Sequence, residues 1–393
     1  MSHQSSDPVK KIEEFLRNNS SYLRNPTEQD RIFAKGRKIE VVYAVVSKGI
    51  PLFRTEGAGD VTTIDITLRK TAKEGGSSSK AYVSVPAILP EKMQAKLRRR
   101  MLEVLRSRFS DKVKEQVKKY REQLKFTKLG ESDSWNCFIM PPSGEKETDL
   151  GMCGFCPSCN ILGAIITKTE NENAKTSYGI KSRVVHDIAF ATVPYEKCVV
   201  DLTHNKVGDG VSYTGKSLYG EPHVVPGVVF VGKLAMYDVT EREAKLVLHS
   251  LATISRMGGG ETKYGSVQVI VVGLKAGDRE TVSSYDIVRH VLEETGGALV
   301  EPEAVIRKVV DYIKNKGFDA VVDGNTGIDS LDTAIPISDD ELAKLWEEDN
   351  YRYSENVVKY ITRAEGTSTA EGSEKKGGRR GKKSRGAEEE EDQ

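Results

Sequence analysis

Four cysteines in this sequence have the spacing of a metal-binding site. Cys153, Cys156 and Cys159 are two residues apart from one another in GMCGFCPSC, and Cys137 lies a short loop upstream. A gap of two residues lets neighbouring thiolates reach one ion at Zn–S distances of ~2.3 Å. The sequence therefore predicts one bound zinc ion, with Cys137 as the favoured fourth ligand. The alternatives for the fourth position are His186, Cys198 and His204.

The predicted zinc ion has a structural role. A catalytic zinc usually keeps one coordination position open for water, whereas four thiolates close the site. A disulfide framework is the alternative, but it is typical of small secreted chains, and this chain has only 5 cysteines in 393 residues. Residues 132–177 are rich in Gly, Pro, Asn, Lys and Glu. Zinc would therefore supply folding free energy that a small apolar core cannot supply there.

The hydrophobic pattern before the cysteines predicts two strands and a long helical stretch. Residues 39–46 form a β-branched run typical of a buried strand, and residues 61–68 alternate in the manner of a second strand. Pro86 and Pro90 are expected to bracket a loop. Apolar residues then recur every three or four positions as far as Leu124, which predicts one long basic helix or a broken pair.

After the cysteines the pattern repeats as strand, helix and strand. Residues 224–237 predict a strand, Thr240 and Glu243 form a capping box that begins a helix, and residues 266–272 predict the closing strand. This order fits an α+β protein with a ferredoxin-like core and large insertions. The predicted units are an N-terminal segment (1–38), a core (39–131 and 178–275) with a loop insertion near 194–222, a zinc-binding insertion (132–177), a helical C-terminal region (276–364) and a disordered tail (365–393).

Charge is distributed unevenly along the chain although the net charge is only +1. Residues 91–128 contain 14 Lys and Arg against 5 Asp and Glu, and residues 278–349 contain 7 against 18. Such a layout suits a polyanion on one side of the molecule, or head-to-tail contact between copies. The alternative is that the charges are solvated helix faces of a charge-rich protein. No apolar run of ~18 residues that could span a bilayer and no signal segment is evident, so a cytoplasmic protein is expected.

The loop MGGGETKYG at 257–265 lies between the second predicted helix and the last strand. The consecutive glycines Gly258, Gly259 and Gly260 cost conformational entropy and therefore need a reason. One reason is a backbone that approaches phosphates, with Lys263 adding charge and Tyr264 a stacking face. The alternative is a glycine stop to the helix, followed by a turn.

Taken together, several segments resemble the backbone subunits of CRISPR effector complexes, which belong to the RAMP superfamily. These segments are, in order, GAGD, VPAILPEKMQAKLR, CPSCNILG, VPGVVF and MGGGETKYG. Within that superfamily the sequence most resembles the type I-D backbone subunit, which carries a zinc-binding insertion. The resemblance implies a modified RNA-recognition-motif core with a glycine-rich loop after its second helix.

The resemblance also implies a function. Such subunits coat the spacer part of a CRISPR RNA as repeated copies in a filament, together with other effector subunits, and the guide then pairs with a target DNA strand. An inserted thumb kinks the guide, and either the 194–222 stretch or the zinc-binding insertion suits that part. Binding a guide without reading its sequence requires contacts to its phosphates. The candidate RNA-binding residues are Arg54, Lys96, Arg98, Lys181, Arg183, Arg256, Gly258, Gly259, Gly260 and Lys263.

A catalytic role would depend on Asp60. This residue ends the GAGD motif and resembles, by context, an aspartate that supports metal-dependent target cleavage in type III relatives. No second acid or His/Lys cluster accompanies it at motif spacing, so the prediction is a binding protein and not an enzyme. The alternatives are a nuclease acting through Asp60, an RNA-processing endoribonuclease of the same superfamily, and a zinc-containing transcription or ribosome-associated factor.

Overall fold

The computed structural model describes residues 7–28, 30, 32–54, 60–69, 80–124, 135, 137, 152–171, 174–205, 218–259 and 263–350. The helices are α1 (Pro8–Asn18), α2 (Pro90–Ser107), α3 (Asp111–Leu124), α4 (Pro157–Leu162), α5 (Tyr195–Cys198), α6 (Glu241–Ala252), α7 (Ser284–Thr295), α8 (Pro302–Lys314) and α9 (Asp339–Lys344). Shorter turns are the 3₁₀ segments η1 (Ser20–Tyr22) and η2 (Ile328–Ser330) and the π-helical turn η3 (Leu345–Asn350). The strands are β1 (Lys38–Ser47), β2 (Thr63–Arg69), β3 (Lys80–Ile88), β4 (Ala164–Asn171), β5 (Ala174–Ile180), β6 (Val184–His186), β7 (Ala189–Ala191), β8 (Val199–Asn205), β9 (Leu218–Val224), β10 (Val229–Tyr237), β11 (Val267–Gly277) and β12 (Asp319–Ala320).

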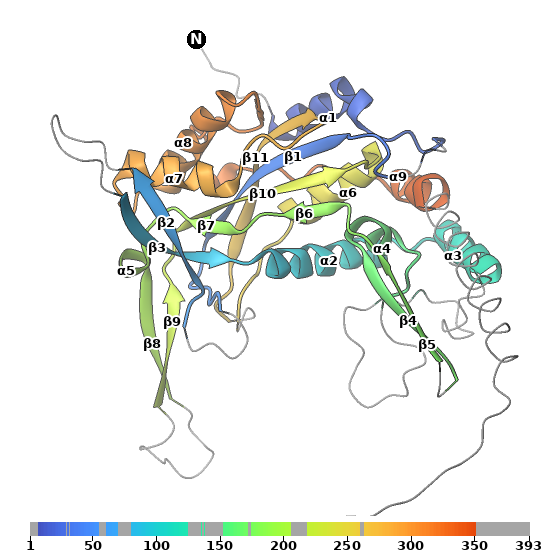
Figure 1. The fold of residues 1–393 in the computed structure, drawn as a ribbon, viewed down its shortest axis with the longest axis horizontal. Coiled ribbons are helices and arrows are strands. Elements are labelled where there is room, and N and C mark those ends of the chain that lie inside the picture. Colours follow the sequence, from blue (N-terminus) through green and yellow to red (C-terminus); the bar gives the residue numbers. More distant parts are fainter. Residues whose placement is uncertain are drawn as a thin grey trace, which may run out of the picture.

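One antiparallel sheet organises the described residues (Figure 1). Its strand order is β12-β11-β1-β10-β7-β3-β2, and β6 also pairs with β10. The β-branched run in β1 occupies the centre, where both neighbours, β10 and β11, run antiparallel to it. Because both faces of β1 are covered, nearly all of its residues are buried. The α+β class predicted from the sequence is confirmed.

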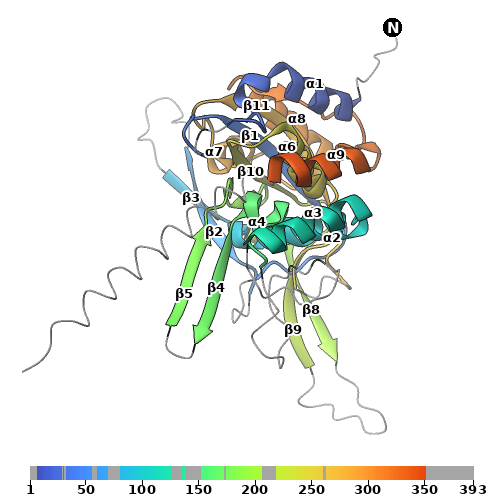
Figure 2. The ribbon, with the colours of Figure 1, turned by 90° about the vertical axis from the view of Figure 1, so that its right-hand side faces the viewer.

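Helices cover the sheet on both faces. α2 packs against α6 on one face, and α7 packs against α8 on the other (Figures 1 and 2). The basic residues of α2 and the acidic residues of α7 and α8 therefore lie on opposite sides of the sheet. Among the described residues, the helices lack the length and apolar character that crossing a bilayer requires.

Two hairpins project from the side of the molecule that carries α2. β4 pairs with β5, and β8 pairs with β9, each outside the main sheet. Figure 1 shows the two hairpins to either side of α2, and Figure 2 shows both extending away from the sheet in the same direction. The side of the molecule with the basic helix is thus flanked by two arms.

Two sequence predictions about the strands were wrong. The single strand expected over 224–237 is two strands, β9 and β10, because Gly227 at φ +85° turns the chain between them. The loop expected around Pro86 is the end of β3, where Pro86 pairs with Thr63 of β2. β2 is at the edge of the sheet order, so a proline next to it is tolerated at the end of the ladder.

The helix predictions were more accurate. The basic stretch forms the broken pair α2 and α3, and Met93, Leu97 and Met101 are buried as the periodicity predicts. The capping box at the start of α6 is present, with Thr240 accepting from the Glu243 amide. The predicted disordered tail at 365–393 lies outside the described residues.

Candidate nucleic-acid interface and metal centre

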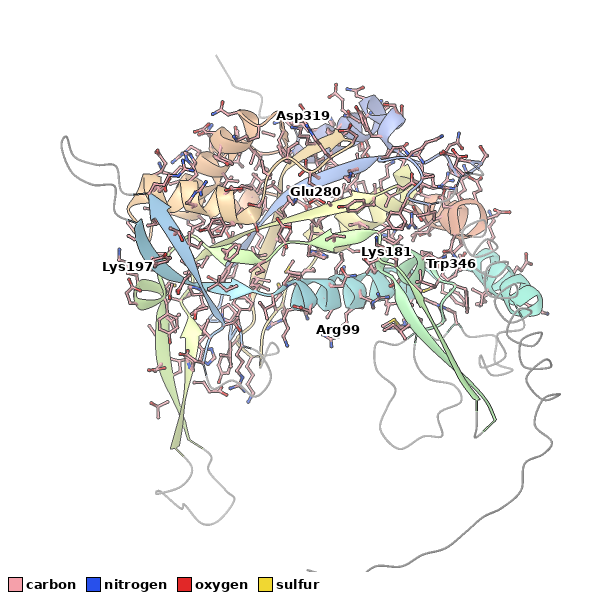
Figure 3. The ribbon with its side chains drawn as sticks, in the orientation of Figure 1. Arg99, Lys181, Lys197, Glu280, Asp319 and Trp346 are labelled. Carbon is pink, nitrogen blue, oxygen red and sulfur yellow. The ribbon has the colours of Figure 1, made fainter. Side chains whose placement is uncertain are left out.

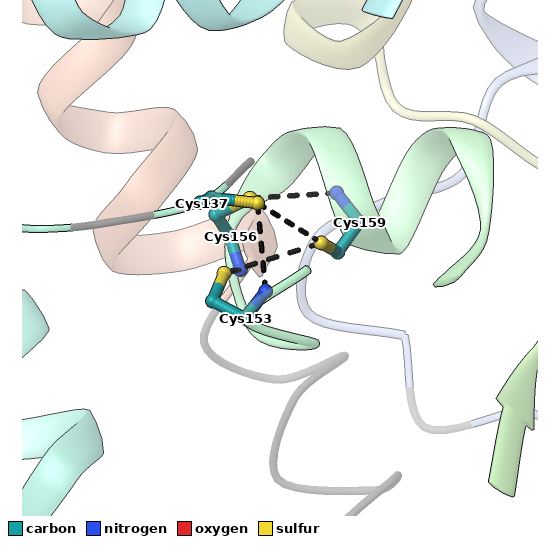
Figure 4. Close-up of side chains that lie close together, drawn as sticks. All are labelled: Cys137, Cys153, Cys156 and Cys159. Carbon is teal, nitrogen blue, oxygen red and sulfur yellow. Dashed lines mark hydrogen bonds between the residues drawn. The ribbon is translucent and has the colours of Figure 1, made fainter. Parts of the chain in front are cut away.

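The four predicted cysteine ligands converge on one point (Figure 4). Their sulfur atoms all lie within 4.8 Å of one another, with Cys137 Sγ at 3.6 Å from Cys159 Sγ and at 3.8 Å from Cys156 Sγ. Thiolates around a tetrahedral zinc are ~3.8 Å apart, given Zn–S bonds of ~2.3 Å. The cluster therefore has the dimensions of a zinc site with four cysteine ligands.

Local backbone geometry holds the cysteines in that arrangement. The amide of Cys156 donates to Cys153 Sγ at 3.4 Å, and the amide of Cys159 donates to Cys156 Sγ at 3.5 Å. Burial and the neighbouring Cys137 raise the pKa of Cys156 well above its usual value. A cation at the centre would reverse this cost by stabilising the thiolates. The donor set fits a structural zinc and leaves no ligand position for water.

The alternative fourth ligands lie elsewhere in the fold. Cys198 is buried at the end of α5, and its thiol donates to the Val193 carbonyl. His186 is on β6, which pairs with β10, and His204 is on β8. Cys137 is therefore the residue that completes the set.

Two of the arginines predicted to bind RNA instead anchor the cysteine module to the core. Arg98, on α2, is 5% exposed, and its guanidinium donates to the carbonyls of Leu162 and Gly163 at 2.8 and 2.6 Å. Arg183 is 1% exposed, donates to the carbonyl of Asn160 and forms a buried ion pair with Glu243 of α6. Both guanidinium groups are therefore buried and bonded within the protein, which gives them a structural role in place of the predicted contact with RNA.

A hollow of about 280 Å³ lies where α2 begins, next to the end of β1 and the glycine loop. Its rim carries the cationic side chains of Arg54, Lys92, Lys96 and Arg99. The rest of its wall comes from Leu52, Phe53, Thr62, Ala87, Ile88, Leu89, Ala95, Met257, Gly258 and Gly259. Four of the predicted RNA-binding residues, Arg54, Lys96, Gly258 and Gly259, thus lie around one hollow although they come from three separate stretches of the sequence.

Two residues of this site were missed by the sequence analysis. Lys92 and Arg99 are both exposed, and both line the hollow with Lys96. Residues four and seven positions after Lys92 fall on the same helical face, so this spacing was the available signal. Figure 3 shows Arg99 on the side of α2 from which the hairpins project. The basic face of α2 thus lies between the two arms.

The structure gives the glycine loop a packing reason as well. Gly258 has φ +94°, and a Cβ there would lie 2.7 Å from the Leu52 carbonyl oxygen, too close for any other residue. Gly259 donates its amide to that same carbonyl at 2.8 Å. Gly260 lies outside the described residues. The glycines therefore allow the loop to lie directly against the chain that follows β1.

The remaining candidates are exposed but do not line the hollow. Arg256 directly precedes the glycine loop, Lys263 lies within it, and both are exposed. Lys181 directly follows β5, with its ammonium 4.8 Å from the centre of the Phe33 ring (Figure 3). Arg54, on the rim, already forms an ion pair with Glu221 of β9 at 3.2 Å.

Asp60 is engaged by neighbouring groups. The Tyr195 hydroxyl donates to Asp60 Oδ1 at 2.8 Å, and the Val61 amide donates to the same oxygen. Burial raises the pKa of Tyr195 to about 12, and the bond to Asp60 adds to the shift. Among the described residues, Asp60 belongs to no group of three or more metal-ligating side chains.

Comparison with known proteins decides the family. A sequence model described as Csc2 CRISPR matches residues 19–354. The chain belongs to the Csc2 CRISPR family. A crystal structure of Csc2 from Thermofilum pendens matches with 34% sequence identity and a TM-score of 0.61, covering 88% of this chain and 95% of that one. The predicted resemblance to a CRISPR effector backbone subunit of the RAMP type is confirmed.

More distant matches come from assembled complexes. A chain of a CRISPR RNA-guided surveillance complex, captured before nicking, matches at 11% identity and a TM-score of 0.43, with 79% of this chain and 100% of that one covered. A second such complex matches at 9% identity and a TM-score of 0.41, with 79% and 98% covered. Comparison with curated protein sequences finds no match.

Proposed function

We propose that this member of the Csc2 family coats the spacer part of a CRISPR RNA as repeated copies in an effector filament, with a role in antiviral DNA targeting. The observation that carries the proposal is the convergence of four cationic side chains and the glycine loop on the hollow at the start of α2. Phosphates are the ligands that such a set of cations attracts, and their contacts carry no sequence information. The partners are the guide RNA, further copies of the chain, other effector subunits and, through the guide, the target DNA strand.

The arrangement of the sheet supports a modified RNA-recognition-motif core. The strands β11, β1, β10 and β7 are neighbours in that order, and helices α2 and α6 connect them in the way of a ferredoxin-like unit. The buried strand β1 offers no exposed aromatic surface for stacking bases on the sheet. RNA recognition through loops and through α2 is compatible both with this order of strands and helices and with the burial of β1.

Of the two arms, hairpin β8–β9 is the better thumb. It belongs to the predicted 194–222 insertion, and Glu221 on β9 pairs with Arg54 on the rim of the hollow. Hairpin β4–β5 follows α4 and so belongs to the cysteine module. We assign that module a structural zinc ion and no catalytic role. The subunit binds and does not cleave, since Asp60 is engaged by Tyr195 and Val61.

The direct test is RNA binding by a Lys92→Gln variant, with Lys314→Gln on α8 as the matched control. Both lysines are exposed, but only Lys92 lines the hollow. We expect Lys92→Gln to weaken the binding of poly(U) and of mixed-sequence RNA alike, by about tenfold, or 1.4 kcal/mol. The slope of log affinity against log salt should become less negative by about 1. Equal effects of both variants, or binding that is independent of salt, would contradict the proposal.

A further inference from the structure

The chain that follows β1 is bonded to the glycine loop along its length. The Ile50 amide donates to the Tyr264 carbonyl at 3.1 Å, and the Leu52 carbonyl accepts from the Gly259 amide at 2.8 Å. Gly49 allows this approach, because a Cβ at that position would lie 2.6 Å from the Tyr264 carbonyl oxygen. The segment 49–54 therefore fixes where the glycine loop lies.

The same segment is bonded on its other side to hairpin β8–β9. The Val224 amide, at the end of β9, donates to the Pro51 carbonyl at 3.1 Å. Arg54 pairs with Glu221, two positions before the buried His223 on the same strand. One short segment thus connects the arm to the loop, and both the segment and the loop contribute residues to the hollow.

His223 closes this connection by contacting both partners at once. Its ring is fully buried, and Nδ1 lies 2.7 Å from the Ile50 carbonyl oxygen. Because a carbonyl only accepts, Nδ1 carries the proton in this contact. The edge of the ring also meets the Tyr264 ring, with centroids 5.2 Å apart at 73°. The backbone of Ile50 is therefore held at its N–H by the Tyr264 carbonyl and at its C=O by His223.

We propose that His223 is a positioning residue that couples hairpin β8–β9 to the glycine loop, so that single-stranded RNA bound at the hollow also orders the hairpin. The inference rests on the proposed function, because the hairpin can respond to RNA in this way only if RNA binds at the hollow. Both sides contact the same residue, Ile50, so a ligand that holds the loop in place also restricts the position of segment 49–54. Through His223 and Val224 that restriction reaches β9.

The test measures hydrogen–deuterium exchange of the full-length protein with and without a poly(U) oligonucleotide. His223→Phe keeps a ring against Tyr264 and loses the Nδ1 donor, whereas His223→Asn keeps a donor and loses the ring. In the wild type we expect RNA to slow exchange in both the glycine loop and the hairpin strands β8 and β9. In His223→Phe we expect protection of the loop to persist and protection of the hairpin to fall at least threefold. His223→Asn should retain part of the hairpin protection, since the donor is restored.

The outcomes separate the inference from the function on which it rests. If RNA protects the loop and the hairpin as strongly in His223→Phe as in the wild type, the coupling is contradicted and RNA binding is intact. Absence of RNA protection anywhere in the wild type would instead contradict the proposed function. Thermal unfolding of each variant without RNA shows whether that variant still folds. If His223→Phe does not fold, the comparison between wild type and His223→Asn decides. Hairpin protection retained at least in part by His223→Asn then supports a role for the donor, and loss of loop and hairpin protection together opposes it.

Discussion

The cysteine module and the hollow use neighbouring arginines of the same helix in opposite ways. Arg98 is turned into the protein, where it binds the carbonyls at the end of α4. Arg99, one position later, is exposed and lines the hollow. Successive residues on a helix are about 100° apart, so adjacent arginines cannot serve one partner. A basic run in a sequence therefore gives the number of positive charges but does not indicate which of them contact a polyanion.

The two regions also differ in what holds them together. The cysteine module combines thiol contacts, the buried Arg98 and the buried pair Arg183–Glu243, so its parts are fixed before any partner arrives. The hollow is lined by buried apolar side chains and by four cationic ones, of which Lys92 and Arg99 are exposed and Arg54 pairs with Glu221. Substitutions should accordingly affect folding in the first region and binding in the second.

The largest expected effect is that of Cys156→Ser. This change removes one of the four sulfur ligands and the side chain that caps α4. Structural zinc contributes ~10–16 kcal/mol to the folding of zinc-finger peptides, so we expect a loss of at least about 4 kcal/mol of unfolding free energy here. Metal analysis should show one zinc per chain in the wild type and none in the variant, while the main sheet keeps its circular-dichroism signal.

Cys198→Ser is the matched control for that change. Cys198 is equally buried but lies outside the cluster, so its replacement should leave the zinc content unchanged. Zinc absent from wild-type protein purified without chelators, or retained in full by Cys156→Ser, would contradict the assignment.

The second prediction tests the contrast directly with Arg98→Met and Arg99→Met. Arg98→Met leaves buried carbonyls without their donor, and we expect a loss of about 3 kcal/mol of unfolding free energy. Arg99→Met should change stability by less than about 0.5 kcal/mol, as is usual for surface sites. It should instead weaken RNA binding by about tenfold, or 1.4 kcal/mol. On the same preparations, urea unfolding measures the stability of each variant and fluorescence anisotropy measures its affinity for RNA. The same changes in stability and affinity in both variants would contradict the contrast between the two arginines.

Much of this contrast was open to prediction, but not all of it. The cysteine spacing predicted the four-cysteine cluster because side chains separated by two residues can readily converge on one point, and the periodicity of α2 predicted its buried face. Whether Arg98 and Arg183 are buried depends on where the carbonyls of α4 lie. That position is set by tertiary contacts, which a local sequence pattern does not specify. The same holds for the hollow, since residues 52–54, α2 and the glycine loop come together only in the folded protein. Gly227 can be read from the sequence, but the valines on both sides of it indicate one continuous strand, so the turn there was not predicted.

The third prediction concerns pH and His186, a buried residue whose substitution should affect folding and not binding. Neither ring nitrogen has a partner among the described residues, and burial lowers the pKa of His186 to about 4 from 6.5. The unfolded chain therefore takes up a proton at a higher pH than the folded one does. This contribution to stability is complete above pH 6.5 and is lost as pH falls towards 4, by about 3 kcal/mol in total. His186→Leu should reduce the acid sensitivity of urea unfolding between these values, and an unchanged pH profile would contradict the prediction.

The smallest expected effect is that of Asp60→Ala. The carboxylate is already engaged by the Tyr195 hydroxyl, and a negative charge in this region is mildly repulsive to phosphates. Guide binding should change by less than about twofold, because no contact with the guide is lost. The decisive assay is a reconstituted complex given labelled target RNA or single-stranded DNA with Mg²⁺. Intact targets in both wild type and variant are expected. Periodic cuts that disappear in Asp60→Ala would show that this carboxylate holds a metal ion, and the region of the hollow would then be catalytic as well as binding.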